Sequence, residues 1–241
     1  MKKITLVDIK LFLIILSVLF LYAFSNHRNN NRFLKADPIV KFAGDSQHLF
    51  ITHQQVNNLL IQKLGQTSTV LKERLDLNKI ERVFDLHKMI EKAQVYTKVD
   101  GQLHLEIKQK TPIARVIQDQ THYYLDNNGN SMPLSTNYSA HLPLIKGIWN
   151  GKLKADYFEI IKLISEDTFL NNHITGILIQ PDGKIQMTNR LFDYKIKLGH
   201  PNNFKSKIAC YKAFLNHAYK SDKIKSYQTV NITFDNHVVC Q

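Results

Sequence analysis

The sequence predicts an α+β chain with an N-terminal transmembrane helix, a small β-α-α-β-β domain, and a strand-rich C-terminal β domain with two helices. Three observations predict this organisation: an uncharged apolar run near the start, capped helices followed by a hairpin turn, and many short strand-like runs after residue 111. The expected boundaries are 1–10 for a tail, 11–25 for the anchor, 26–36 for a polar tether, 37–110 for the small domain and 111–241 for the β domain.

Composition excludes several other classes of protein. The 241 residues are 44% hydrophobic and include only 2 Cys, which excludes a disordered chain and a disulfide-stapled miniprotein. Lys and Arg number 32 against 20 Asp and Glu, so the net charge is +12. This charge is spread thinly, as +5 in residues 1–35, +2 in 36–112 and +5 in 113–241. A nucleic-acid site would concentrate it on one face or arm, so we expect no nucleic-acid partner.

The N-terminal apolar run, 11–24, contains fourteen residues without a charge. A membrane-spanning helix needs about 20 mostly apolar residues. Extending the run toward the N-terminus includes Asp8 and Lys10, and the Lys10 ammonium can reach the membrane interface. A signal peptide cleaved near Ala23-Phe24-Ser25 is the alternative. We expect a membrane anchor whose apolar side chains are Leu11, Phe12, Leu13, Ile14, Ile15, Leu16, Val18, Leu19, Phe20 and Leu21.

Charge alone does not fix the orientation of this anchor. Three basic residues precede it and three follow it: Lys2, Lys3 and Lys10 against Arg28, Arg32 and Lys35. Because long following domains translocate largely regardless of charge, we expect the tail in the cytoplasm and the bulk of the chain outside. The Asn-rich residues 26–36 lack periodicity and are typical of a tether.

Helix caps and a turn define the small domain. Residues 38–42 form a β-prone run, and Thr52 is a plausible N-cap for a helix that Gly65 closes. Asp76 is placed to cap a second helix. Two alternating runs then meet at Asp100-Gly101, which indicates a β-hairpin.

Strands dominate the sequence from residue 113 onward. Turn signals separate them at Asn128-Gly129, Asp182-Gly183 and Gly199-His200-Pro201. Apolar stripes at helical spacing predict two helices, around Tyr157–Ile164 and Ile208–Ala218, with the stripes in the core. The expected strands are 113–117, 122–125, 142–145, 174–180, 184–188, 194–198 and 229–240.

The sequence contains no recognisable chemistry-bearing motif. There is no Gly-rich phosphate loop, no Gly-x-Ser-x-Gly elbow and no His-Glu-x-x-His helix, and the eleven His form no ligand-like cluster. We therefore predict no catalytic, cofactor or metal site. Cys210 and Cys240 are expected to be two isolated thiols, with a disulfide as the less favoured alternative.

The last predicted strand is the candidate binding element. Its side chains alternate, with Val230, Ile232 and Phe234 on one face and Thr229, Asn231 and Thr233 on the other. A strand at a sheet edge offers unpaired N–H and C=O groups that a partner strand can use. An ordinary strand paired on both sides is an equally good interpretation.

Several short motifs follow one another along the chain. A strand runs into a basic-x-Pro-hydrophobic-Ala step within Leu103–Arg115. Further segments come after it, in this order: Tyr124–Gly129, Met132-Pro133, Leu142–Gly147 and Val230–Cys240. Together, the order of these motifs resembles that of the bacterial division family FtsQ, called DivIB in some groups. Many members place Glu-Arg before the Thr/Ser-Pro step, where this chain has Gln109-Lys110, which indicates a divergent, Bacteroidetes-type branch.

This resemblance implies a POTRA-like fold for residues 37–110 and a single-pass inner-membrane protein, periplasmic in bulk and enriched at the division septum. It implies a non-enzymatic, essential-type scaffold that links early and late septal divisome proteins, without a small-molecule substrate. The implied partners are FtsB/FtsL-like proteins, which would pair with Thr229–Phe234. A charge at Ile232 or Phe234 would then abolish partner capture while the small domain stays folded.

Two other classes remain open at this stage. An envelope assembly or transport factor with a POTRA-type domain would carry repeated units or a membrane β-barrel. A secreted or membrane-anchored enzyme would need a site that the motifs do not show.

Overall fold

The computed structural model describes residues 6–30, 34–35, 37–44, 47–65, 70–72, 75–118, 120–147, 154–220, 222–234 and 237–241. The chain divides into two compact units, Met1–Gln109 and Lys110–Gln241. The break lies one residue before the position expected from the sequence. Each unit has its own sheet and its own buried core.

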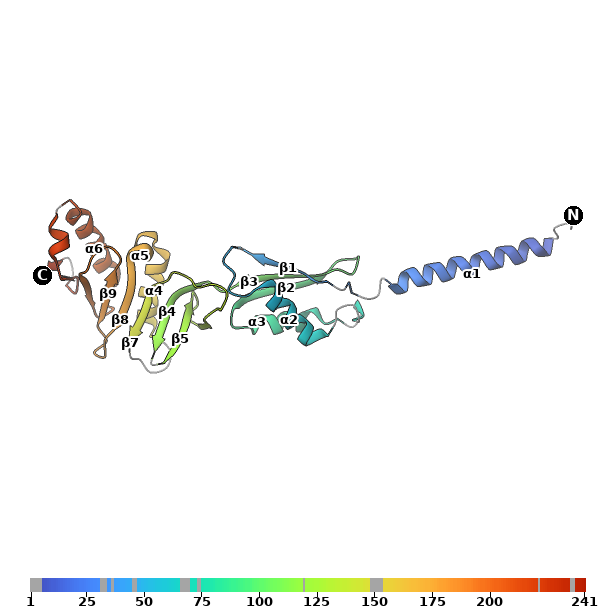
Figure 1. Cartoon of the computed structure of the whole chain (residues 1–241), viewed down its shortest axis with the longest axis horizontal. Coiled ribbons are helices and arrows are strands. Elements are labelled where there is room, and N and C mark those ends of the chain that lie inside the picture. Colours follow the sequence, from blue (N-terminus) through green and yellow to red (C-terminus); the bar gives the residue numbers. More distant parts are fainter. Residues whose placement is uncertain are drawn as a thin grey trace. The chain divides into compact units, whose positions relative to one another are not determined.

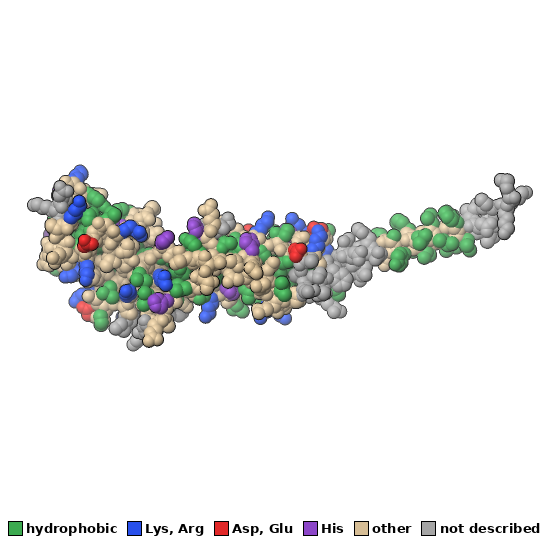
Figure 2. Space-filling model, in the orientation of Figure 1, with side chains coloured by type: hydrophobic (Ala, Val, Ile, Leu, Met, Phe, Trp, Pro, Cys, Tyr) green, Lys and Arg blue, Asp and Glu red, His purple; other side chains and the backbone are tan. Residues whose placement is uncertain are grey.

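The first element is a long helix, α1 (Leu6–Asn30). It continues past the expected anchor, so the prediction of an irregular tether was wrong for residues 26–30. The physical reason is that adding residues to an existing helix costs far less than starting one. Its described side chains are exposed, and Figure 2 shows hydrophobic groups along it. Across the described ranges, no helix is both long enough and apolar enough to cross a membrane.

The remainder of the first unit has the predicted order β-α-α-β-β. Its three strands lie in the order β1-β3-β2, with β1 parallel and β2 antiparallel to the central β3. The two helices lie on one face of this sheet (Figure 1). The elements are β1 (Ile39–Ala43), α2 (His53–Leu64), α3 (Leu77–Asp85), β2 (Ile90–Thr97) and β3 (Leu103–Gln109).

Local sequence signals explain these boundaries. Thr52 accepts a hydrogen bond from the N–H of Gln55, and Gln55 bonds back to Thr52, which completes a capping box at the start of α2. Asp76 accepts from the N–H of Lys79 at the start of α3. Gly101 has a φ of 88° in the hairpin between β2 and β3, a conformation that favours glycine. The predicted caps and hairpin are confirmed.

Gln109 ties the end of β3 to the segment before α2. Its side-chain Oε1 accepts hydrogen bonds from the N–H groups of Phe50 and Ile51, at 2.7 and 3.1 Å. Ile51 is buried in the core of the small domain. The Gln109 amide thus supplies the acceptor at the position where the resemblance had led us to expect a carboxylate.

Replacing Gln109 by Leu is expected to destabilise the first unit by about 2–3 kcal/mol, because two sheltered N–H groups lose their acceptor. Gln109→Glu retains an acceptor oxygen and is expected to stay close to wild type. Urea denaturation followed by the near-ultraviolet signal of this unit measures both variants. Equal losses of stability in Gln109→Leu and Gln109→Glu would show that the acceptor oxygen at position 109 does not stabilise the unit.

The second unit is built on a nine-stranded sheet in the order β12-β11-β10-β9-β8-β7-β4-β5-β6. In the described residues of this unit, three α-helices and one short 3-10 helix accompany the sheet, where two helices were expected. The strands β6 and β12 were not predicted as separate elements. The strands are β4 (Pro112–Gln118), β5 (Thr121–Asp126), β6 (Ser131–Pro133), β7 (Leu144–Gly147), β8 (Ile174–Ile179), β9 (Ile185–Asn189), β10 (Lys195–Gly199), β11 (Thr229–Asn231) and β12 (Val239–Cys240).

One buried row of side chains crosses this sheet from strand to strand. Register places Val116, Ile145, Ile177, Met187, Ile196 and Val230 side by side. All are in the core, together with apolar side chains of the helices. The helices therefore cover this face of the sheet. They are α4 (Ala155–Glu166), α5 (Thr168–His173), α6 (Phe204–Ala218) and the 3-10 helix η3 (Asp222–Ser226).

Three polar rings form a chain inside this core. The Nε2 of His173 lies 2.7 Å from the hydroxyl of Tyr211, and that hydroxyl lies 3.0 Å from the hydroxyl of Tyr194. All three residues are buried. Burial raises the pKa of Tyr194 to about 12 and also raises the pKa of Tyr211, while it lowers the pKa of His173.

The lowered pKa of His173 predicts a stability that falls with acid. The unfolded chain takes up a proton on this histidine near pH 6.5, whereas the folded chain resists it, so stability is present above that pH and is lost below it. The expected slope is at most about 1.4 kcal/mol per pH unit. Urea denaturation of wild type and His173→Phe between pH 5 and 8 measures it. A wild-type slope equal to that of His173→Phe would contradict the assignment.

Candidate functional site at the C-terminal sheet edge

The predicted binding segment does not form one long strand. Only Thr229–Asn231 is a strand, β11, and it pairs with β10 on one side and β12 on the other. The expectation that this segment is the sheet edge was therefore wrong. The physical reason is a local turn, because the Asn231 side chain accepts the N–H of Thr233 at 3.0 Å and ends the strand.

A close contact between Gly199 and the side chain of Thr233 supports this turn. Gly199, at the end of β10, has a φ of 75°, and a Cβ built there would lie 2.7 Å from the Cγ2 of Thr233. The positive φ favours glycine here, and the absence of a Cβ leaves room for the Thr233 side chain. Ile232 adds a backbone bond, since its N–H donates to the carbonyl of Lys197 at 2.9 Å.

The free edge of the sheet is β12. Thr229 and Gln241 exchange two backbone hydrogen bonds, each of 3.0 Å, so they form a hydrogen-bonded pair of the antiparallel ladder. Val230 and Cys240, the adjacent pair, are therefore the non-hydrogen-bonded type. It follows that the N–H and C=O of Cys240 point away from β11, in the direction from which another strand could approach.

The side chains around this edge differ sharply in exposure. Val230 and Ile232 are fully buried, whereas Phe234 is 56% exposed and Val239 is 43% exposed. Simple alternation had placed Ile232 and Phe234 on the same face, but the bend after β11 interrupts it. Of the two exposed apolar residues, Val239 lies on β12 itself and Phe234 lies in the chain after β11.

The sequence reasoning missed Val239 and Cys240 as edge residues. The available signal was the polar pair Asp235-Asn236 between two β-prone runs, which is typical of a hairpin turn. That pair lies outside the described residues. Treating residues 229–240 as one strand concealed the edge.

This unit also contains the two cysteines of the chain, Cys210 on α6 and Cys240 on β12. Cys210 and Cys240 are both free and half-buried, and burial raises the pKa of the Cys240 thiol. Within the described ranges, no three His, Cys, Asp or Glu side chains are grouped so that they could hold a metal ion. What the edge offers is backbone donors and acceptors with apolar neighbours.

Comparison with known proteins places this unit in a family. Residues 111–241, more than half of the chain, match the family described as FtsQ/DivIB, C-terminal related. The chain belongs to the FtsQ/DivIB family. Residues 31–108 match the POTRA-like domain, in agreement with the expected fold of the first unit.

One curated relative shows how divergent this member is. The cell division protein FtsQ of Salinibacter ruber is 24% identical over 169 residues. The match covers 64% of this chain and 64% of that protein. The chain thus aligns with less than two thirds of its relative, and the family assignment is to an FtsQ-like group of cell division proteins rather than to an enzyme family.

Proposed function

We propose that this protein is a scaffold of the bacterial division complex that captures an FtsB/FtsL-like partner by strand addition at β12. The observation that supports this best is the outward-facing N–H and C=O of Cys240 at the end of the nine-stranded sheet. A partner strand there gains main-chain hydrogen bonds and covers the exposed Val239 and Phe234. Family membership supports the choice of a division partner.

The opposite edge of the same sheet is less suited to this role. It is β6 (Ser131–Pro133), which contains Pro133, a residue with no N–H to donate. Natural proteins place proline at sheet edges to discourage edge pairing. Between the two ends of the sheet, β12 is the better docking strand.

The same proposal places α1 in the lipid bilayer of the inner membrane, with both folded units in the periplasm and the protein concentrated at the division septum. Support comes from the large apolar side chains of residues 11–21, which are 51–71% exposed. Exposing apolar side chains to water is unfavourable, and surrounding them with lipid removes this free-energy cost. Full-length chain should float with vesicles in a density gradient, and Leu13→Arg with Leu16→Arg should stay at the bottom. Equal flotation of the wild type and the double arginine variant would contradict the proposal that α1 anchors the chain in the membrane.

Two proline variants test the docking edge. Cys240→Pro removes an N–H that points away from the sheet, whereas Gln241→Pro removes the N–H that donates to Thr229. We expect Cys240→Pro to lose little thermal stability, because the Cys240 side chain is only partly buried against the core, and to lose capture of the FtsB/FtsL-like partner in a pull-down. Gln241→Pro should lower both the thermal stability and the capture of the partner.

The same variant has a cellular readout. A fluorescent fusion of wild type should form a band at mid-cell, and the Cys240→Pro fusion should fail to retain the partner there. Capture of the partner by Cys240→Pro at wild-type strength would overturn the edge assignment. A uniform envelope signal of wild type throughout division would overturn the scaffold itself.

A further inference from the structure

One face of the nine-stranded sheet carries basic side chains and no acidic ones over most of its strands. The buried row that crosses the sheet, which includes Ile145 and Ile177, packs against the helices, so the neighbouring residues on each strand point to the opposite, outer face. The strands β4 and β7 to β12 contain no Asp or Glu. Their cationic side chains all lie on the outer face: Arg115, Lys146, Lys195 and Lys197.

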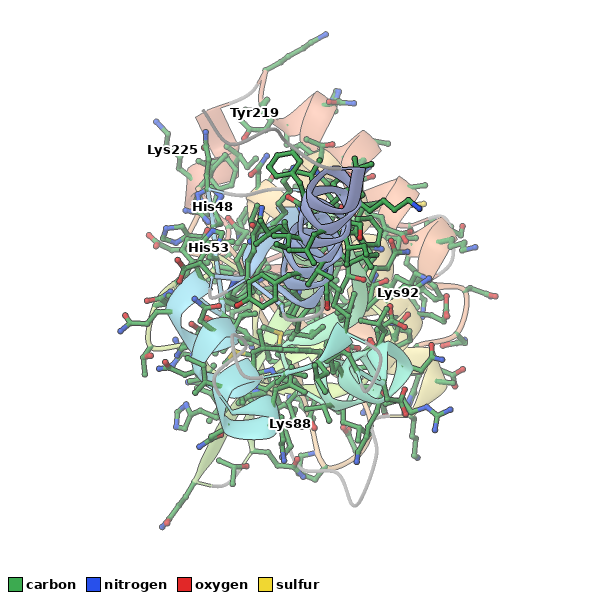
Figure 3. All side chains as sticks on the ribbon, turned by 90° about the vertical axis from the view of Figure 1, so that its right-hand side faces the viewer. His48, His53, Lys88, Lys92, Tyr219 and Lys225 are labelled. Atoms are coloured by element: carbon green, nitrogen blue, oxygen red, sulfur yellow. The ribbon has the colours of Figure 1, made fainter. Side chains whose placement is uncertain are left out.

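These four cations are not neutralised within the described part of the chain. The described ion pairs of the second unit join other residues. The three lysines are exposed, and the Nε of Arg115 is buried with no hydrogen-bond partner among the described residues. Lone exposed lysines such as Lys88 and Lys225, which Figure 3 labels, are ordinary, but protein surfaces usually intersperse both signs of charge. The outer face is therefore complementary to an anionic partner.

A neutral strip separates the cations into two pairs, Arg115 with Lys146 on one side and Lys195 with Lys197 on the other. Register places Lys146 and Lys197 in one row across the sheet, three strand spacings or about 14 Å apart. The strip between the pairs consists of uncharged residues of β7, β8 and β9: Leu144, Gly176, Leu178, Gln186 and Thr188. It is partly apolar, since Leu178 is 38% exposed.

The dimensions of this strip match an α-helix. A helix with its side chains is about 10–12 Å wide, so its two flanks reach cations that are about 14 Å apart. Lys195 and Lys197 are about 6.8 Å apart along β10, close to the spacing of about 6 Å between helix positions i and i+4. Neighbouring strands are rotated by about 20–25°, so the four cations do not share the plane that a flat membrane surface requires. Helices on both faces of a sheet are a common layer arrangement, and helices already cover the other face.

We propose that the outer face of the C-terminal sheet is a docking surface for an amphipathic α-helix of a partner protein, with a narrow apolar stripe and Asp or Glu on both flanks. The stripe covers Leu178 and the rest of the neutral strip, and the acidic flanks meet the two cation pairs. This surface uses side chains and not the backbone of β12, so it is independent of strand addition at that edge.

A synthetic peptide tests the outer face in the full-length chain. The probe is a fluorescent amphipathic helix with Leu along one stripe and Glu on both flanks, and fluorescence anisotropy follows its binding to the chain in neutral detergent micelles. Lys146→Glu combined with Lys197→Glu should weaken binding roughly tenfold, because an attraction on each flank becomes a repulsion. A peptide of the same composition but scrambled order, which has no stripe, should bind weakly. High salt should weaken the binding of the helical peptide to wild type.

Two control variants make the result specific. Lys205→Glu with Lys225→Glu makes the same change of charge at exposed positions outside the sheet and should bind the helical peptide as wild type does. Cys240→Pro should also keep wild-type affinity for this peptide, which separates the outer face from the β12 edge. The proposal is overturned if wild type does not bind the helical peptide, if it binds the scrambled peptide equally well, or if Lys146→Glu with Lys197→Glu binds as tightly as wild type.

A tag on the neutral strip distinguishes a helix from lipid. Gln186→Cys, made in a Cys210→Ser, Cys240→Ser background, carries a trifluoromethyl group whose fluorine NMR signal reports what reaches the strip. With the chain held in phosphatidylcholine vesicles, the helical peptide should shift this signal. Without peptide, the signal should be the same in phosphatidylcholine and in phosphatidylglycerol vesicles. A shift caused by phosphatidylglycerol alone would assign the face to anionic lipid and overturn the helix proposal.

Discussion

Replacing Ile232 by Asp is expected to unfold the C-terminal domain, with a loss of more than about 4 kcal/mol. The Ile232 side chain is fully buried in the large core, and its N–H donates to Lys197. A carboxylate at this position has no polar partner in the core and must either be desolvated or force the turn after β11 out of the sheet. Urea denaturation of the variant measures the loss.

Phe234→Asp is the matched variant two residues away. Phe234 is exposed, so the same substitution should change stability by no more than about 0.5 kcal/mol. If Phe234 flanks the docked strand as proposed, partner capture should fall while the fold stays intact. A stable Ile232→Asp variant would contradict the structure, and unchanged capture by Phe234→Asp would remove this residue from the interface.

These two residues show where sequence reasoning reached its limit. Alternation places Ile232 and Phe234 on one face and predicts the same outcome for both. The structure separates them because the Asn231 side chain turns the backbone at Thr233. A hydrogen bond between a side chain and the backbone two residues on leaves no periodic signal, so a pattern of apolar residues does not reveal it.

Much of the fold was nevertheless predictable, because local chemistry determines it. The caps at Thr52 and Asp76 and the turn at Gly101 each satisfy backbone needs within a few residues, and all three were expected. The order of the nine strands depends instead on pairing between distant segments, such as β4 with β7 and β10 with β11. Local patterns carry no such information, which is why the free edge was assigned to β11 and not to β12.

Asp126 illustrates the same limit at a charged position. Asp126 comes directly after the predicted strand 122–125 and before the expected Asn128-Gly129 turn, and it is the last residue of β5. Nothing in the sequence indicated that it would be buried. The carboxylate is fully buried, with Oδ1 accepting the N–H groups of Asn128 and Asn130 at 3.0 and 2.7 Å. Its Oδ2 lies 3.0 Å from the ammonium of Lys110. One side chain therefore closes the β5–β6 turn and neutralises a largely sheltered lysine.

Asp126→Ala is expected to destabilise the second unit by about 3–5 kcal/mol, because it leaves the Lys110 ammonium unpaired and two turn N–H groups without their acceptor. Asp126→Asn retains the oxygen that accepts the two turn N–H groups, so its loss of stability should be clearly smaller than that of Asp126→Ala. Asp126→Ala combined with Lys110→Met removes the unpaired charge and should recover part of the loss. Denaturation of these variants forms a double-mutant cycle. A strictly additive cycle would mean that the pair contributes nothing, and the turn alone would then account for the burial of Asp126.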